Sequence, residues 1–189
     1  PQISFLKLEI DQAPETYKGC LGGYFSDLSL NKNNFFTDIS NYLSYETGQP
    51  THCYDANKIN GKLVFQEIER DEEFETLFDK KVNLTKKNAV FLLNDEVINL
   101  AGVVGGKSTS CSTNTKTVIV ECAFFHPEAV IGKSIKYDIE SEASHKFERG
   151  VDPGCHENVL RRFIKVASEH ANIKDMSIIY YKSKENKIL

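Results

Sequence analysis

The sequence has no excess of basic residues, and this shortage argues against one broad class of function. Among its 189 residues, 23 are Lys or Arg and 27 are Asp or Glu, which gives a formal net charge of -4. A free-standing nucleic-acid-binding protein is expected to carry a basic excess or a basic patch. We therefore expect any contact with RNA to draw most of its phosphate-binding groups from other domains.

Paired cysteines and long apolar runs are also missing. The five cysteines are odd in number, and no two of them form a Cys-x-x-Cys pair. This pattern is typical of free thiols in a reducing compartment rather than of a disulfide framework. No apolar run approaches the ~20 residues that a membrane-spanning helix requires, so we expect no membrane partner.

Three common chemical signatures are absent or incomplete. The chain has no Gly-x-Ser-x-Gly elbow of a serine hydrolase, and no His/Cys set with zinc-ligand spacing, so no metal is expected. Gly106-Lys107-Ser108 matches the end of a phosphate-binding loop, but that loop would begin at Ala101 instead of Gly. Residues 109–115 also do not predict the helix that such an anion site needs. A glycine turn between strands is the alternative.

The residues that are present predict one α+β unit with several strands and about four helices. Twelve Phe and eight Tyr supply the apolar area for a core. Alternation and β-branched content predict strands, two of them paired around Asn94-Asp95-Glu96. The predicted strands are Ser4–Ile10, Lys62–Glu69, Ala89–Leu93, Val97–Val104, Thr117–Phe125 and Met176–Tyr181.

Helix signals occur between these strands. Two proline-initiated helices are predicted, from Pro14 to about Leu28 and from Pro127 to Tyr137, and a third helix over Asp38–Thr47 ends at Gly48. Asp152-Pro153 predicts a further helix start, because Asp is a good N-cap and Pro suits the first helical position. Val159, Phe163 and Val166 give this last helix an apolar face. Residues 69–75 are expected to be a loop or a hairpin tip, and residues 107–116 are expected to be a loop.

Five short motifs, in this order and separation, resemble the editing module of the bacterial phenylalanyl-tRNA synthetase beta chain. They are Asp38-Ile-Ser-Asn-Tyr42, Gly48-Gln-Pro-Thr-His52 followed by Tyr54-Asp55, Ala101-Gly-Val-Val-Gly-Gly106, Glu121-Cys-Ala-Phe-Phe125 and Phe147-Glu-Arg-Gly-Val-Asp-Pro153. In that family the module hydrolyses the ester of tyrosine wrongly attached to the phenylalanine tRNA. The resemblance implies one compact module over residues 1–189, with layered mixed β-sheets and helices of the three-layer β/β/α type.

The same resemblance implies partners. The family's synthetase is cytoplasmic and contains two alpha and two beta chains, so the expected partners are the aminoacyl end of tRNA(Phe), the remainder of the beta chain and the alpha chain. No cofactor is expected in the module, because the family's ATP and Mg²⁺ chemistry and its aminoacylation lie outside it. The sequence begins at Pro1 rather than Met, and we expect it to be a piece of a longer chain.

The resemblance places the family's phenol-binding carboxylate at Glu121. A synthetic site for phenylalanine rejects an added hydroxyl only modestly, whereas a second site that must bond the hydroxyl rejects phenylalanine strongly. Such a site needs an apolar slot with a strong acceptor at its far end, and Glu121 ends an apolar strand. The alternative is a solvent-facing Glu paired with a Lys.

His52 matches the family's editing-site histidine, a catalytic residue that would orient the attacking water or bond the ester and ribose. Its alternative is a histidine that bonds a nearby carbonyl. Gly102 and Gly105 match glycines that let the substrate approach the backbone closely, and a side chain at Gly105 should fill the pocket. A strained turn that requires Gly is the alternative at both positions.

Four further residues complete the expected substrate-binding set. Ser40 and Asn41 match polar residues near the substrate, and Ser141 and Ala143 match the pocket wall. One departure stands at Asn31, where many relatives carry Arg, although the register allows Lys32 to substitute. This departure leaves open a structural or tRNA-binding module that has lost hydrolysis. A free-standing relative that acts in trans on mischarged tRNA is a third hypothesis.

Overall fold

The computed structural model describes residues 1–182 of the chain, with side chains up to residue 180. In chain order the elements are β1 (Gln2–Ile10), α1 (Gly19–Asp27), α2 (Phe35–Thr47), β2 (Thr51–Asp55), the short helical turn η1 (Ala56–Lys58), β3 (Leu63–Ile68), β4 (Glu72–Glu75), β5 (Lys81–Leu84), β6 (Asn88–Leu93), β7 (Glu96–Leu100), β8 (Val104–Gly105), η2 (Lys107–Thr109), β9 (Thr117–Phe124), α3 (Pro127–Val130), α4 (Lys133–Tyr137), α5 (Glu142–Arg149), α6 (His156–Ser168) and β10 (Ile173–Lys182).

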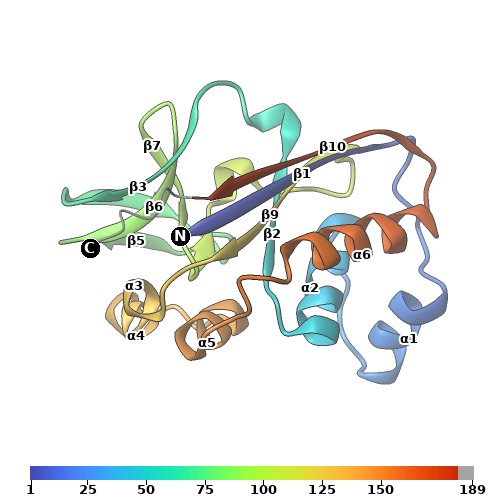
Figure 1. Ribbon diagram of the computed structural model, residues 1–189, viewed down its shortest axis with the longest axis horizontal. Coiled ribbons are helices and arrows are strands. Elements are labelled where there is room, and N and C mark those ends of the chain that lie inside the picture. The colour runs from blue at the N-terminus through green and yellow to red at the C-terminus, as the bar shows by residue number, and fades with distance from the viewer. Residues whose placement is uncertain (183–189) are drawn as a thin grey trace.

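The central layer is an antiparallel sheet, sheet A, with strand order β10-β1-β9-β2. Along each strand, successive side chains point to opposite faces of the sheet. One face carries Leu6 and Leu8 of β1 and Val118 and Val120 of β9, and these residues pack in one cluster with apolar residues of α1, α2 and α6. We call this the helical cluster. Figure 1 shows the three helices lying along this side of sheet A.

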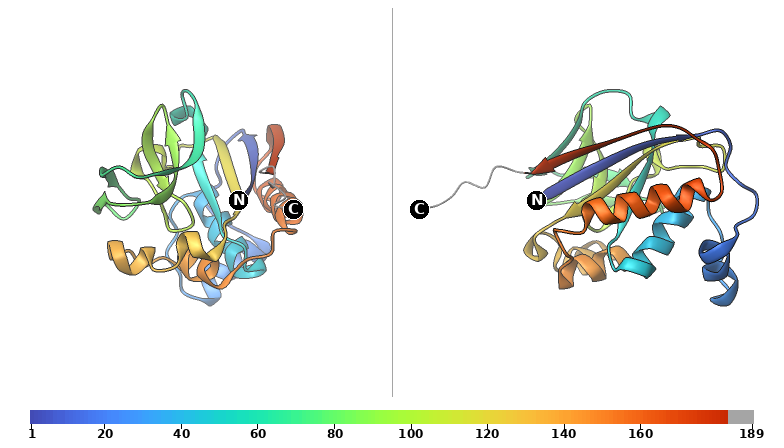
Figure 2. Two further views of the ribbon diagram at one scale, coloured as in Figure 1. Left: turned by 60° about the vertical axis from the view of Figure 1, so that its left-hand side comes forward. Right: turned by 45° about the vertical axis from the view of Figure 1, so that its right-hand side comes forward.

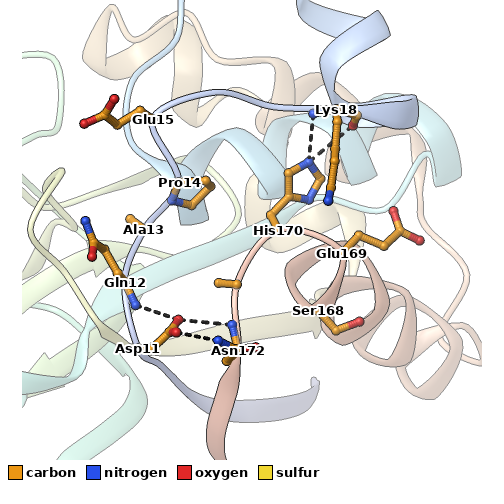
Figure 3. A pocket seen from close by; sticks show the side chains of 11 residues that line it. Asp11, Gln12, Ala13, Pro14, Glu15, Lys18, Ser168, Glu169, His170 and Asn172 are labelled. Atoms are coloured by element: carbon orange, nitrogen blue, oxygen red, sulfur yellow. Dashed lines mark hydrogen bonds between the residues drawn. The ribbon is translucent and has the colours of Figure 1, made fainter.

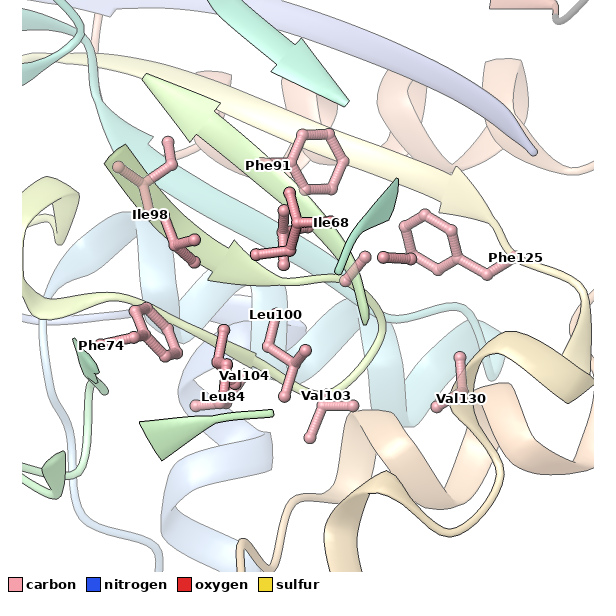
Figure 4. Close-up of a cluster of buried hydrophobic side chains, with 14 of the residues drawn as sticks. Ile68, Phe74, Leu84, Phe91, Ile98, Leu100, Val103, Val104, Phe125 and Val130 are labelled. Atoms are coloured by element: carbon pink, nitrogen blue, oxygen red, sulfur yellow. The ribbon is translucent and has the colours of Figure 1, made fainter. Parts of the chain in front are cut away.

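The opposite face of sheet A packs against a second antiparallel sheet, sheet B, with strand order β3-β6-β7-β8. Aromatic side chains fill the space between the sheets, among them Phe65, Phe91 and Phe125, with Phe65 and Phe125 stacked at 5.7 Å between ring centroids. We call these residues the interlayer cluster, and Figure 4 shows part of it between the strands. The left view of Figure 2 shows the green strands of sheet B to one side of sheet A.

These layers confirm the predicted α+β fold, in which sheets are packed with helices into one unit. The order is sheet B, sheet A and helices, as expected for a β/β/α arrangement. The strand pairing differs from the mixed pairing expected, because each pair within sheets A and B of the described chain is antiparallel. Among the described residues, no helix has the length and apolar content to cross a membrane.

Several predicted elements are confirmed within a few residues. The helix expected over Asp38–Thr47 is α2, which starts at Phe35. Its N-cap is Asn34, whose side chain accepts a hydrogen bond from Thr37 N at 3.1 Å. It ends as expected at Gly48, which has φ 78°. The hairpin around Asn94-Asp95 is also present, with positive φ at both residues. Its second strand stops at Leu100, so Val97–Val104 is two strands joined by a turn.

Two predicted helix starts are wrong. The first helix begins at Gly19 instead of Pro14. Tyr17 lies in the loop before it and donates a hydrogen bond to Asp38 at 2.6 Å. The last helix begins at His156 instead of Pro153. Asp152 does not act as its N-cap, because its Oδ1 accepts from Gly154 N at 2.7 Å and closes a turn before the helix.

Two further regions differ from the prediction. Residues 72–75, expected in a loop or hairpin tip, form β4 and pair with β5, because Phe74 and Val82 alternate with charged or polar residues and become buried. The helix expected from Pro127 to Tyr137 is divided into α3 and α4 at Gly132, where φ is 76°.

Candidate functional site

Glu121 lies on the face of sheet A that packs against sheet B. It pairs with Phe5 on β1 and with His52 on β2. Its side chain is only 5 % exposed. This burial rules out a solvent-facing Glu paired with a Lys, the alternative for this position. The structure therefore places one carboxyl group among the apolar residues between the two sheets.

Both sheets hold this carboxyl group in place. From β2, Tyr54 Oη donates to Glu121 Oε2 at 2.6 Å. From β7 in sheet B, Asn99 Nδ2 donates to Tyr54 Oη at 2.8 Å and lies 3.5 Å from Glu121 Oε2. Burial raises the pKa of Glu121 to about 8, and the hydrogen bond from Tyr54 opposes this rise. Much of the carboxyl is therefore protonated at neutral pH.

His52 stands beside this pair. Its ring meets the ring of Tyr54 edge to face, with 4.4 Å between centroids. Its Nε2 is buried and has no hydrogen-bond partner in the described part of the chain. Burial lowers the pKa of His52 to about 4, so the imidazole is neutral at physiological pH. A neutral, unpartnered ring nitrogen can bond a ligand or a water molecule.

The two glycines have different physical roles. Gly105 lies against His52, and a Cβ added at Gly105 would sit 2.1 Å from His52 Cε1. A side chain there would therefore displace the imidazole, and the expectation that it would also fill the substrate pocket stays a prediction. Gly102 has φ 71°, and an added Cβ would lie 2.8 Å from Val130 Cγ2. The turn and its close packing are enough to require Gly at this position, while contact of Gly102 with a substrate stays a prediction.

Ser141 and Ala143 lie at the start of α5, and Ser141 contacts the same glycine turn. Ser141 is the N-cap of α5 and accepts from Ser144 N at 3.1 Å. Its hydroxyl also donates to Val103 O at 2.6 Å, which ties α5 to the turn between Gly102 and Gly105. Ala143 packs against the interlayer cluster. These contacts place Ser141 beside the turn and Ala143 against the interlayer cluster, while a contact of either residue with a substrate stays a prediction.

Ser40 and Asn41 lie on α2, on the other side of sheet A from Glu121. Ser40 Oγ donates to Thr51 O at 2.7 Å, next to His52, and Asn41 is exposed. The structure therefore does not bring their side chains to Glu121, although Ser40 holds the start of the strand that carries His52. Asn31 is exposed in the loop before α2. Lys32 does not take a place beside Glu121, because its Nζ lies 4.4 Å from the ring centroid of Tyr17 in the helical layer.

Neither Tyr54 nor Asn99 is among the site residues that the sequence predicts. Tyr54 follows His52 by two residues in one strand, and this spacing alone places both side chains on the same face. Asn99 is a lone amide in the apolar strand β7. Its link to Tyr54 depends on how the two sheets stack, and neither strand predicts this.

Two cavities lie away from these residues. The larger, about 530 Å³, is polar and lies at the ends of β1 and α6, where His170 contacts the backbone of Lys18 (Figure 3). The second, about 380 Å³, lies beside Gln2, His156 and Tyr180. Neither cavity is lined by Glu121 or His52. In the described part of the chain, no group of three or more His, Cys, Asp or Glu residues is placed to hold a metal ion.

Comparisons with known proteins agree on one relationship. Residues 26–172 match the B3/4 domain family. Phenylalanine–tRNA ligase beta subunits from Francisella tularensis and Bordetella pertussis are 34% identical over 138 residues and 42% identical over 115 residues. These alignments cover 73% and 61% of this chain, but only 18% and 14% of the relatives. The chain thus spans less than a fifth of their length.

A solved structure shares the fold. An N-terminal fragment of the phenylalanyl-tRNA synthetase beta subunit from Pyrococcus horikoshii aligns with a TM-score of 0.54 and 12% sequence identity. The alignment covers 96% of this chain and 50% of the fragment. At this identity the likeness concerns the fold alone.

Proposed function

The chain belongs to the B3/4 domain family, and from this premise we propose that it is the editing module of a phenylalanine–tRNA ligase beta chain. In this role it hydrolyses the aminoacyl ester of Tyr-tRNA(Phe). The observation that carries the proposal is the burial of Glu121 between two sheets, directly opposite His52 and close to the glycine turn. A buried carboxyl group without a cationic partner is costly, and sites of function commonly retain such groups.

The apolar surroundings of Glu121 account for selection of tyrosine over phenylalanine. A phenol that enters beside Phe5 and Phe91 would bury its ring against apolar surface and bond the carboxyl group with its hydroxyl. Phenylalanine would offer the same ring but would leave one oxygen of the carboxyl group, the one that Tyr54 does not bond, without a partner in an apolar site. Such an unpaired group costs more than a missing methylene, so the discrimination is strong.

The reaction itself needs little from the protein besides positioning. Water attacks the ester carbonyl carbon, the bond to the ribose oxygen breaks, and that oxygen takes up a proton as free tyrosine leaves. Neutral His52 would orient the water or the ester through Nε2, which has no other partner among the described residues. Holding the reactants in line can supply much of the rate enhancement, and the ribose hydroxyl can share the proton transfer.

Ser40, Asn41, Gly102, Gly105, Ser141 and Ala143 complete the proposed substrate-binding set. Of these, Gly105 and Ser141 are tied most directly to the site, through His52 and through the turn. We also propose the partners expected of such a module: the aminoacyl end of tRNA(Phe), the rest of the beta chain and the alpha chain, in a cytoplasmic enzyme. The module would use no cofactor of its own.

Deacylation of Tyr-tRNA(Phe) and Phe-tRNA(Phe) by the native protein that contains these residues tests the proposal. We expect hydrolysis of the tyrosyl ester only, and a loss of at least about tenfold in Glu121→Ala and in His52→Ala. Exposed Glu157 and His145 provide matched controls, because their replacement by Ala should leave the rate unchanged. Unchanged hydrolysis in both site variants would remove the site assignment.

A module that has kept the fold but lost hydrolysis is the second candidate. Two observations favour it: neither of the two cavities is lined by Glu121, and Asn31, which stands where the resemblance implies an Arg, is exposed. In that case the wild-type protein would bind tRNA and leave Tyr-tRNA(Phe) intact. A free-standing protein that acts in trans would be recognised from its gene, because an integral module must be flanked by the rest of the beta chain.

A further inference from the structure

The two oxygens of the Glu121 carboxyl group have different surroundings. Oε2 accepts from Tyr54 Oη at 2.6 Å and lies 3.5 Å from Asn99 Nδ2. Among the described residues, no hydrogen-bond partner is found for Oε1. Oε2 is therefore bonded within the protein, and Oε1 is available to bond a ligand.

The residues that hold Oε2 come from two different sheets. Tyr54 is 0 % exposed and lies on β2 of sheet A, whereas Asn99 is 4 % exposed and lies on β7 of sheet B. Asn99 also donates to the phenol oxygen of Tyr54 at 2.8 Å, so the three groups form one network. A carboxyl group bonded from both layers has one orientation, because rotation about its last bond would break these contacts.

A second tyrosine–glutamate pair in the same chain shows what an ordinary structural pair contains. Tyr42 Oη donates to Glu46 Oε1, also at 2.6 Å, but Arg162 bonds both oxygens of Glu46 at 2.7 and 2.8 Å. Both carboxylate oxygens of that pair are thus satisfied and its charge is neutralised. Glu121 has neither feature, because burial is the main cause of its raised pKa and no cation among the described residues lowers that pKa.

We propose that Tyr54 and Asn99 are positioning residues that hold Oε2 of Glu121, so that Oε1 is the atom that bonds the phenol of the substrate. This inference rests on the proposed function. Tyr54 makes no bond to the reacting ester in this arrangement. Its hydroxyl determines selectivity by fixing the direction in which the carboxyl group faces the incoming ring.

Replacement of Tyr54 by Phe tests the inference with almost no change in volume. We expect Tyr54→Phe to raise KM for Tyr-tRNA(Phe) about tenfold and to leave hydrolysis of Phe-tRNA(Phe) at its low level, because one hydrogen bond that orients the carboxyl group is lost. The matched control is Tyr42→Phe, which removes a bond of the same length outside the site and should change neither rate. A merely structural role of Tyr54 would lower both hydrolysis rates together.

The outcomes separate this inference from the proposed function. Absence of Tyr-tRNA(Phe) hydrolysis by the wild-type protein would overturn the proposed function and the inference with it. Wild-type hydrolysis with an unchanged or lower KM in Tyr54→Phe would overturn only the inference; a lower KM would identify the Tyr54 hydroxyl as a competitor for the carboxyl group.

A structure of the wild-type protein with bound tyrosine gives a second measurement that does not depend on a variant. We expect the ligand phenol to lie within hydrogen-bond distance of Oε1, with Tyr54 still on Oε2. A ligand phenol on Oε2, with Tyr54 displaced, would contradict the inference.

Discussion

The strands of sheet A send alternate side chains to two faces that differ in chemistry. Towards the helices, β9 places Val118 and Val120 in a cluster with the apolar residues of β1. Towards sheet B, the same strand places Glu121 beside His52 and Tyr54. The difference shows that one set of strands can supply stability from one face and keep costly polar groups on the other.

The contrast has an energetic reason. Hydrocarbon packing on the helical face gains free energy for each residue buried. On the other face, burial of Glu121 and His52 moves both pKa values toward the neutral forms, which is the sign of a cost at neutral pH. If the two faces have separate tasks, a change on one face should alter stability and a change on the other should alter selectivity.

The largest expected effect is on the helical face. Leu6→Ala removes a fully buried side chain opposite Val120 and should lower the free energy of unfolding by about 2–5 kcal/mol. The ratio of tyrosyl to phenylalanyl ester hydrolysis should stay the same at temperatures where the variant is folded. Urea unfolding and deacylation assays measure the two quantities. A changed ratio would mean that the two faces are coupled.

The next effect concerns Glu121 and pH. Its pKa is raised from 4.5 to about 8, so its contribution to stability is present below pH 4.5 and is lost as the pH rises through 8. Glu121→Gln cannot ionise and should be more stable than wild type at pH 9 by a few kcal/mol, on the order that such a pKa difference implies. The two proteins should be similar near pH 4.5. Thermal unfolding across this range measures the difference.

Glu46→Gln is the control for that profile. Glu46 pairs with Arg162, which holds its pKa below the usual range, so this variant should be less stable than wild type at neutral pH. If Glu121→Gln followed the same pattern, the carboxyl group of Glu121 would be stabilising in its ionised form, contrary to its burial without a cation.

A smaller effect of opposite sign is expected for His52. Its pKa is lowered from 6.5 to about 4, so its contribution to stability is present above pH 6.5 and is lost as the pH falls through 4. His52→Gln should therefore lose less stability than wild type between pH 6.5 and 4. Acid unfolding followed by circular dichroism tests this expectation. Equal acid sensitivity of the two proteins would indicate that water already solvates the imidazole in the folded state.

The smallest effect is expected at the edge of the site. Ser141→Ala removes the N-cap of α5 and the bond to Val103 O, and should cost about 1 kcal/mol of stability. Because this bond ties α5 to the glycine turn, the rate of tyrosyl ester hydrolysis should fall together with stability. Ser168→Ala, near the end of α6, is a control whose hydroxyl bonds only the preceding turn of its own helix.

The elements that follow from local signals are those that were predicted best. Gly48 ends α2 because a left-handed residue is easiest for Gly, and Asn94-Asp95 makes the hairpin for a similar reason. The helix starts expected at Pro14 and Asp152 were wrong because side chains there make other bonds. Tyr17 bonds Asp38 from a distant part of the chain, and Asp152 accepts from Gly154 N in a turn. A residue that commonly begins a helix predicts the helix start correctly only when the residues around it make no competing hydrogen bonds.

For the site, the sequence by itself determined which residues share a strand and a face. The family motifs marked Glu121 and His52, and a spacing of two residues already placed Tyr54 beside His52. Only the tertiary structure decided that Tyr54 bonds Glu121, that Asn99 joins them from the other sheet, and that Ser40 lies behind the site. These contacts depend on how separate layers stack. Stacking is a property of the packed core as a whole, and no single segment of the chain encodes it.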